Sequence, residues 1–578
     1  MIHLCPVMLQ YRDRLSDSGR DAVLKAIHLA LIEIERMDVD LEYTNIVLKD
    51  ITNTILGGEL LCDMRVQDRG RQKLHDWLCY TNQSGGVTEL NSPAYTPIAL
   101  RVLHTLSTHT SDREVAVLAR AASARIGLSY TLRIHPETGR LAGPYSRAYL
   151  YQVLGQTGPE IEFLKKAFDE EMVPNWLLHV PDSLARPAAI IEGCNGHRKY
   201  SYTTWMSDSY TLGTATQELD SQANRFIAGQ STVFCMHFHN NQQQGGVVYC
   251  RYILDDKWVG DFRTATARPD RELLLDEGRF FGAQDRSSMI GVYAPRGLDG
   301  WQGHHAAKLA IVVSRCTDVE EILVNNRVVQ SLPIDIPEAA VVGLKVGCAF
   351  LAFRPFSRTN LGQDAPLRLL EREGDLVFEI YNYAGLNKTF WELATPGSFY
   401  QGQPRCAFYA EAAECSEFDS LQMFVDQIKS GRFTDSLEPF SPQTRIQQQR
   451  SWQLVYTRAE TRLGLNVDLW QWRLLDRWTS AQPNQYQRLD SSVARQVQGD
   501  LIQLNGDNLH TNGLPLWFYA HPPTKTWVFG GYAEYPTELI LELAERRLHI
   551  HNFRYGVVTI VNQTTELDTN PEATFDWE

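Results

Sequence analysis

The chain has 578 residues, 43% of them hydrophobic, and a formal net charge of −14. One hydrophobic core rarely serves a chain of this length, so we expect about two or three domains. The acidic balance excludes a nucleic-acid partner, because binding to a phosphate backbone needs clustered lysine and arginine. A few local arginines can still hold an acidic substrate.

No apolar run is long enough to span a bilayer, so no membrane partner is expected. The first residues lack the basic and apolar regions of a signal peptide, which predicts a cytoplasmic protein, or a secreted or periplasmic one if a signal was removed. The 10 cysteines include no CxxC pair, which indicates reduced thiols. The sequence predicts no cofactor and leaves the oligomeric state open.

Helical spacing of apolar residues dominates positions 16 to 175. We expect helices over 22–37, 46–60, 72–80, 96–106, 111–126, 146–154 and 159–171. The fifth begins with Ser111 and Glu114 at the spacing of a capping box. Short connections predict that successive helices pack as antiparallel hairpins.

After about residue 185 the apolar period changes to two. We expect strands over 199–206, 232–238, 246–253, 307–313, 322–330, 376–383 and 525–532. Asn325-Asn326 and Asn505-Gly506 predict tight hairpin turns. No βαβ alternation occurs, so the sheets should be antiparallel and stacked. A polar segment over 430–449 suggests three domains, at 1–184, 185–440 and 441–578.

Two segments of the helical third carry side chains suited to a site. The first runs from Trp77 to Tyr95 and joins two expected helices through a loop rich in glycine and polar residues, including Glu89 and Asn91. Sites are often built on loops that a rigid helical scaffold holds. We therefore expect Trp77, Glu89 and Tyr95 to bind substrate.

The second segment is Gly143-Pro-Tyr145-Ser-Arg147-Ala-Tyr149. On the expected helix, its two tyrosines lie four residues apart and so share one face, with the arginine between them.

At these residues the chain resembles the polysaccharide lyases that join a helical (α/α) toroid to an antiparallel β-sandwich, the heparinase II/III-like and chondroitin AC-type group. The resemblance implies an α+β multidomain fold with an N-terminal (α/α) helical toroid followed by antiparallel β-sandwich domains. It also implies β-elimination on a uronic-acid-containing polysaccharide. In that group a Tyr or His removes the C5 proton, an Asn or Arg neutralises the carboxylate, and a Tyr protonates the leaving oxygen.

The resemblance assigns neutralisation of the substrate carboxylate to Asn91, with help from Arg147. It assigns the roles of base and acid to Tyr145 or Tyr149. Tyr95 is a further candidate for these roles. A phenol has an ordinary pKa of about 10, so a base needs a nearby cation such as Arg147. The chain departs from the group in two ways. Tyr145 stands where a histidine is expected, and the helical part is short for a complete toroid, so the toroid could be incomplete.

Structural readings of the same residues remain open. Glu89 and Asn91 are also typical of loops that cap helices. Tyr149 also suits an aromatic core position, and Arg147 suits a structural ion pair.

Further candidates lie in the β region. His197, Trp205 and Asp208 stand at its start, where a domain junction could line a cleft, and His304 stands in a second aromatic and imidazole loop. His237 and His239 share one face of an expected strand and could bind zinc. No third ligand stands out, so we assign no metal.

Two alternative functions use the same architecture. A glycoside hydrolase would pair Glu89 with Glu137 or Asp208 across a sugar, at about 5–10 Å. A non-catalytic carbohydrate-binding relative would retain the architecture without the chemistry. The 13 tryptophans and 24 tyrosines suit sugar binding, or a large aromatic core.

Overall fold

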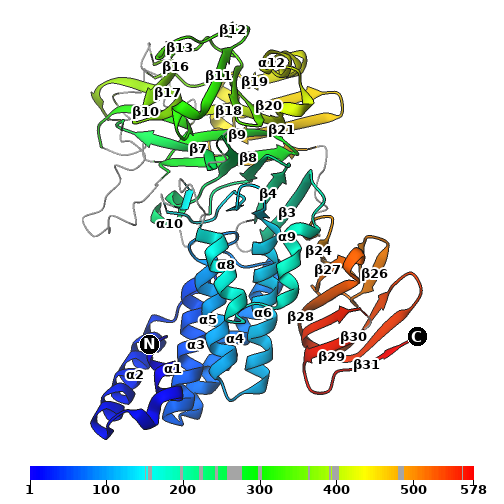
Figure 1. The fold of residues 1–578 in the computed structure, drawn as a ribbon. Coiled ribbons are helices and arrows are strands. Elements are labelled where there is room, and N and C mark those ends of the chain that lie inside the picture. The colour runs from blue at the N-terminus through cyan, green and yellow to red at the C-terminus, as the bar shows by residue number, and fades with distance from the viewer. Residues whose placement is uncertain are drawn as a thin grey trace.

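The computed structural model describes residues 1–149, 152–153, 159–195, 199–219, 225–240, 242, 245–256, 276–296, 302–361, 365–389, 392, 403–479, 487–562 and 564–578. An N-terminal helical region is followed by antiparallel sheets, which confirms the α+β multidomain prediction (Figure 1). None of the described helices is long and apolar enough to cross a membrane.

The helical region places α3 to α6 side by side, in the blue and cyan part of Figure 1. Its helices are α1 (Leu4–Tyr11), α2 (Asp17–Met37), α3 (Thr44–Leu61), α4 (Met64–Ser84), α5 (Thr96–His109), α6 (Arg113–Leu132), α8 (Pro159–Asp169) and α9 (Val180–Ser183). These bounds confirm the expected helices with two exceptions. One is the helix expected over 146–154, and the other is the fifth helix, α6, which begins with a different cap. The N-cap of α6 is Asp112, whose carboxylate accepts from the backbone N–H groups of Glu114 and Val115, so the capping box expected from Ser111 is wrong. The Ser111 backbone N–H donates to the Glu59 carboxylate.

The helix expected over 146–154 is wrong for residues 146–149. Tyr145 exchanges two backbone hydrogen bonds with Thr232, at 3.0 and 2.9 Å, and Ala148 donates to the Gln230 carbonyl at 3.1 Å. These tertiary bonds use the backbone groups that a helix would need, so the segment forms an isolated bridge at Tyr145 followed by bends rather than a helix. Residues 150, 151 and 154 lie outside the described part.

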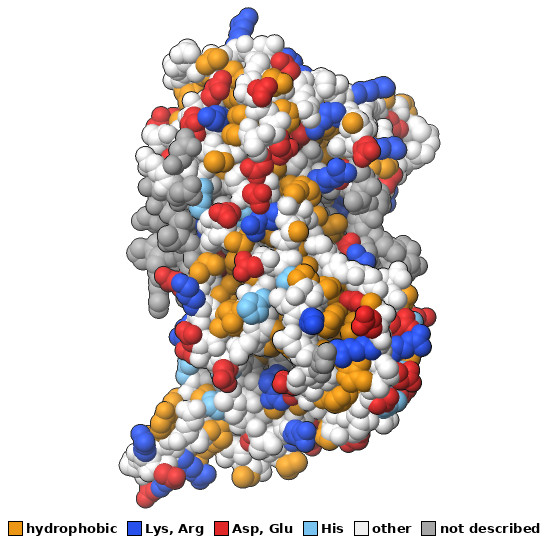
Figure 2. All heavy atoms as spheres, turned by 45° about the vertical axis from the view of Figure 1, so that its right-hand side comes forward, with side chains coloured by type: hydrophobic (Ala, Val, Ile, Leu, Met, Phe, Trp, Pro, Cys, Tyr) orange, Lys and Arg blue, Asp and Glu red, His pale blue; other side chains and the backbone are white. Residues whose placement is uncertain are grey.

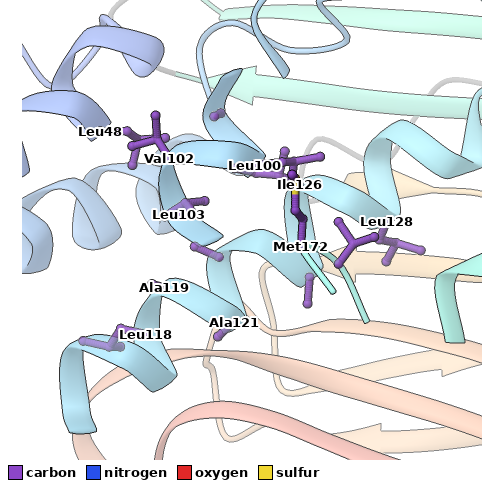
Figure 3. Packing of buried hydrophobic residues seen from close by; sticks show 14 of the residues in the cluster. Leu48, Leu100, Val102, Leu103, Leu118, Ala119, Ala121, Ile126, Leu128 and Met172 are labelled. Atoms are coloured by element: carbon purple, nitrogen blue, oxygen red, sulfur yellow. The ribbon is translucent and has the colours of Figure 1, made fainter. Parts of the chain in front are cut away.

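The helices enclose an apolar core that also reaches the C-terminal strands. Figure 3 shows Leu48 of α3, Leu100 and Leu103 of α5, Leu118 of α6 and Met172 among the buried residues of this cluster. Each fully buried side chain of this kind contributes about 1.5–3 kcal/mol to folding. The same cluster continues into the strands that follow residue 487.

The central β region consists of three sheets. The first pairs antiparallel strands in the order β3 (Ala188–Asn195), β4 (Lys199–Met206), β5 (Tyr210–Ala215), β6 (Phe234–His239), β7 (Gly245–Leu254), β10 (His304–Val313), β17 (Asp375–Lys388), β16 (Leu367–Arg372), β13 (Ile334–Asp335). The second has the order β12 (Arg327–Val328), β11 (Val319–Val324), β14 (Val342–Val346), β15 (Ala349–Pro355), β18 (Cys406–Glu414), β9 (Ser288–Pro295), β8 (Gly278–Asp285). The third is β19 (Arg432–Leu437), β20 (Ser451–Arg458), β21 (Thr461–Asp468), β22 (Arg473–Trp478).

These sheets are stacked, as the sequence predicts. Phe234 of the first sheet lies 5.7 Å from Phe408 of the second, ring centre to ring centre, inside one shared core. A further core joins the second sheet to the third and to α12 (Leu421–Ser430). The short helix α13 (Pro442–Gln447) lies between β19 and β20, which pair with each other across the expected domain boundary at 440.

The C-terminal strands are β23 (Gln487–Asp490), β24 (Ala494–Val497), β25 (Leu501–Leu504), β26 (Asp507–His510), β27 (Trp517–His521), β28 (Thr526–Glu542), β29 (Arg547–Val561), β30 (Thr564–Thr569) and β31 (Thr574–Trp577). They lie beside the helices, in orange and red in Figure 1, and β23 pairs with β3. Asn505 and Gly506 have φ of 55° and 89° between paired β25 and β26, which confirms that hairpin turn. Asn325-Asn326 likewise joins β11 to β12, so the single strand expected over 322–330 is wrong because this turn divides it.

Candidate functional site

The loop between α4 and α5 is tied to the 143–149 segment. The Ser92 hydroxyl donates to the Arg147 carbonyl at 2.7 Å, and the Asn91 side-chain amide donates to the carbonyls of Ala142 and Pro144 at 2.8 and 2.7 Å. Asn91 is buried, with φ of 49°. The two segments singled out from the sequence therefore pack directly against each other.

Glu89 and Arg147 form a buried ion pair at their junction. The Arg147 Nη1 lies 2.6 Å from Glu89 Oε1, and both side chains are under 5% exposed. The Asn45 backbone N–H donates to the other Glu89 oxygen at 2.8 Å. Burial raises the pKa of the Glu89 carboxyl, and the Arg147 charge acts against that rise. The pair fixes the position of the arginine.

Arg147 in turn orients two tyrosines. Its Nη2 donates to the Tyr95 hydroxyl at 2.9 Å, while its guanidinium carbon lies 3.9 Å from the centre of the Tyr95 ring. The hydroxyls of Tyr95 and Tyr149 lie 2.7 Å apart, and both side chains are half-buried. Burial raises the pKa of Tyr95, with Arg147 acting against the rise, so Tyr95 is a neutral phenol that can donate. Glu89, Arg147, Tyr95 and Tyr149 thus form one chain of polar contacts.

Lys49 lies near these polar contacts, and the sequence analysis did not identify it as a candidate. It lies on α3, one turn after Asn45, and interacts electrostatically with Glu89. Burial lowers the pKa of Lys49. Among the described residues Lys49 makes no hydrogen bond or ion pair. The sequence offers one signal for Lys49, its position four residues after Asn45 on the same helical face. That signal points to Glu89 only if the contact between Asn45 and Glu89 is already known.

Tyr145 lies apart from the other tyrosines, in the interior. Its hydroxyl donates to the Leu141 carbonyl at 2.5 Å and lies 2.7 Å from Nε2 of His237, which must therefore donate to it. Burial raises the pKa of Tyr145 well above its ordinary value and lowers that of His237 well below. A histidine therefore does contact Tyr145, from β6 rather than from position 145 itself. Both side chains are fully buried.

Trp77 and Asn91 line a second feature, a pocket between α4, α6, β3 and the C-terminal strands. The indole N–H of Trp77 and the side-chain carbonyl of Asn91 are buried without a hydrogen-bond partner among the described residues. Both residues were predicted for the site, but they line a pocket whose walls do not include Arg147 or the tyrosines at 95 and 149.

The remaining candidate residues that the structure describes, all from the β region, form no hydrogen bond or ion pair with Arg147 or with the tyrosines at 95 and 149. Trp205 lies on β4 against the central core, and the exposed Asp208 accepts from Arg186 at 3.1 Å. His304 is buried at the start of β10, with Nδ1 3.0 Å from the Asp255 carboxylate. His197 lies outside the described residues. His239 is half-buried, and no cluster of three metal-ligating side chains occurs in the part of the chain that the structure describes.

The chain matches no protein-family model and no curated protein sequence. The functional argument therefore rests on the geometry of these side chains.

Proposed function

We propose that the protein is a polysaccharide lyase that cleaves a uronic-acid-containing polymer by β-elimination at the Tyr95–Tyr149 pair. The observation that carries this proposal is the hydrogen-bonded order Arg147, Tyr95, Tyr149. A buried cation polarises one half-buried phenol, which contacts a second. The (α/α) toroid and the polysaccharide substrate implied by the resemblance belong to the same proposal.

In the proposed reaction Tyr149 acts as a phenolate, and its oxygen removes the proton at C5 of the uronate. The C5–H electrons form the new double bond to C4, the C4–O bond breaks, and the tyrosine proton passes to the leaving oxygen. During transfer the Tyr95 hydroxyl donates to the charged Tyr149 oxygen, while Arg147 donates to Tyr95. These two donors stabilise the negative charge on the Tyr149 oxygen before it takes the proton, so they favour the form that acts as the base.

The substrate carboxylate also needs a positive partner, because it gains charge in the intermediate. Asn91 has both amide protons committed to backbone carbonyls, and Arg147 is occupied by Glu89, Tyr95 and Gln230. In this proposal Lys49 neutralises the carboxylate, and Asn91 holds the loop in place.

The test follows the ultraviolet absorbance of an unsaturated uronate while the purified protein is incubated with a panel of uronic-acid polymers. Wild type should produce that absorbance, Tyr149→Phe should not, and the exposed Tyr535→Phe should match wild type. New reducing ends without the absorbance would favour the hydrolase alternative. Binding with neither signal would favour a non-catalytic carbohydrate-binding protein. Unchanged turnover in Tyr149→Phe would reject the assigned site.

A further inference from the structure

Two of the 10 cysteines face each other at the ends of neighbouring strands. Ala349 of β15 pairs with Glu414 of β18, and the next step of this register brings Cys348 opposite Cys415. The Cys415 backbone N–H donates to the Cys348 carbonyl at 2.8 Å, which continues the pairing. Opposed residues of antiparallel strands have Cα atoms about 4.5–5.5 Å apart, and a disulfide requires about 4.4–6.8 Å. The backbone therefore meets the distance that a disulfide requires.

The Cys415 side chain lies against the turn that carries Cys348. Its thiol donates to the carbonyl of Gly347, the residue before Cys348, at 3.7 Å. Burial raises the pKa of Cys415 to about 11, the Lys345 ammonium acts against the rise, and the Cys348 thiol adds to it. All the cysteines are free thiols in the structure, so these two neighbouring sulfur atoms are in the reduced form.

Other contacts hold the backbone on both sides of the pair. Gly347 has φ of 55°, and a Cβ there would meet the His239 carbonyl, so the turn between β14 and β15 lies tightly against the end of β6. The Gly347 N–H donates to the Glu320 carboxylate at 3.0 Å. Across the pair, the Glu414 carboxylate accepts from the Ser209 backbone N–H at 2.9 Å. A disulfide at this position can therefore close by rotation of the two cysteine side chains.

Solvent reaches the pair through Cys348, which is exposed, while Cys415 is half-buried. Cys250 and Cys406 are also close enough to interact, but both are fully buried, so a dissolved oxidant does not reach them. Thiol–disulfide exchange begins at a thiol that the oxidant can contact. Cys348 is therefore the first thiol to react and Cys415 the second.

We infer that Cys348 and Cys415 are a redox-responsive pair, which closes to a disulfide by exchange with a low-molecular-weight disulfide such as oxidised glutathione. The Cys348 thiolate attacks one sulfur of the oxidant, which forms a mixed disulfide and releases one thiolate. The Cys415 thiolate then attacks the Cys348 sulfur, which forms the intramolecular bond and releases the second thiolate. The protein gives up two protons and two electrons, the oxidant becomes two thiols, and excess thiol reverses both steps.

The disulfide encloses strands of both stacked sheets. The two cysteines adjoin β15 and β18 of the second sheet, whereas β16 and β17, which lie between them in sequence, belong to the first. A disulfide between positions roughly 70 residues apart restricts the unfolded chain and so stabilises the fold. Oxidation should therefore raise the unfolding midpoint of the protein.

The experiment is incubation of the full chain with oxidised glutathione, followed by alkylation of the remaining thiols and peptide mass mapping. Wild type should give a peptide pair linked through Cys348 and Cys415, with a urea midpoint above that of the reduced protein. Cys415→Ser should instead accumulate a glutathione adduct on Cys348, because no second thiol displaces it. Cys62→Ser removes another exposed cysteine, at the end of α3, and is the matched control that should form the link as wild type does.

Three results would overturn the inference: no linked pair in wild type while Cys62 carries a glutathione adduct, a persistent adduct on Cys348 in wild type, or a linked protein with an unchanged midpoint. If Cys415→Ser does not fold, Cys348→Ser decides, because it replaces an exposed side chain and should lose both the link and the rise in midpoint. Tyr149→Phe should form the link as wild type does, so this inference and the lyase proposal fail separately.

Discussion

The hydroxyl oxygens of Tyr95 and Tyr149 lie 2.7 Å apart, although 54 positions separate the two residues in sequence. Their contact depends on Arg147, which is fixed by Glu89 and donates to Tyr95. The proposed chemistry gives the two phenols unequal roles, and that difference can be measured.

Tyr95→Phe should lower kcat by about 10²–10⁴-fold, because it removes the donor to the Tyr149 oxygen but leaves that oxygen in place. Tyr149→Phe should abolish turnover. The measurement is kcat against pH in the elimination assay, where Tyr95→Phe should also move the limb of the profile that reports the base. A lower kcat with an unchanged profile would indicate that Tyr95 only supports the structure.

Asn91→Ala should destabilise the fold by about 2–4 kcal/mol, because two buried carbonyls lose their donor and alanine disfavours a left-handed backbone. Denaturant unfolding measures the change. Asn562→Ala is the control, since Asn562 is exposed with φ of 49° and isolates the cost of the backbone conformation. Equal losses in the two variants would contradict a structural role for the Asn91 amide.

Glu89→Gln should cost about 3–5 kcal/mol of unfolding free energy, because it leaves Arg147 charged and buried without its counterion. The double variant Glu89→Gln/Arg147→Met should recover part of that loss, since no buried charge then remains at the pair. A double-mutant cycle by chemical denaturation gives the coupling energy. Strictly additive losses would mean that the ion pair contributes nothing beyond its separate side chains.

His551 should hold the C-terminal strand in a pH-dependent manner. Its Nε2 lies 2.6 Å from Asp576 of β31 and its Nδ1 2.5 Å from Glu538, and the hydrogen bond to Asp576, followed by that to Glu538, raises the pKa of His551. The contribution is thus complete below the unfolded value of about 6.5 and is lost as the pH rises through the raised folded value.

Hydrogen exchange of the β31 amides across this range should show protection falling as the pH rises, after correction for intrinsic exchange. His551→Gln should remove the dependence. Protection that is independent of pH in wild type would count against the contact.

The parts of the fold set by local pattern were predictable, and those set by distant contacts were not. The apolar spacing located α3 and α5, and the asparagines located both hairpins. The 146–149 segment has helical spacing but is not a helix, because the backbone of residues 145–148 bonds to residues 230–232. The same limit applies to the site. The resemblance to the lyases named Tyr95, Arg147 and Tyr149 as candidates, but no local signal places His237 on Tyr145 or Lys49 beside Glu89.

Acidic and basic side chains alternate over the face seen in Figure 2, with small hydrophobic areas between them. No single-sign field covers that face, so in the proposed reaction a local group such as Lys49 provides the attraction for the anionic substrate.

The pairing of β3 with β23 affects the order in which the chain can fold. Leu489 pairs with Glu192, and Tyr532, which lines the same pocket as Trp77 and Asn91, lies roughly 400 positions after Arg125 of α6, which also lines it. A ribosome needs on the order of tens of seconds to make that stretch. Until then the apolar faces of α4 and α6 that receive the C-terminal strands stay uncovered on the nascent chain, and exposed apolar surface of this kind favours aggregation.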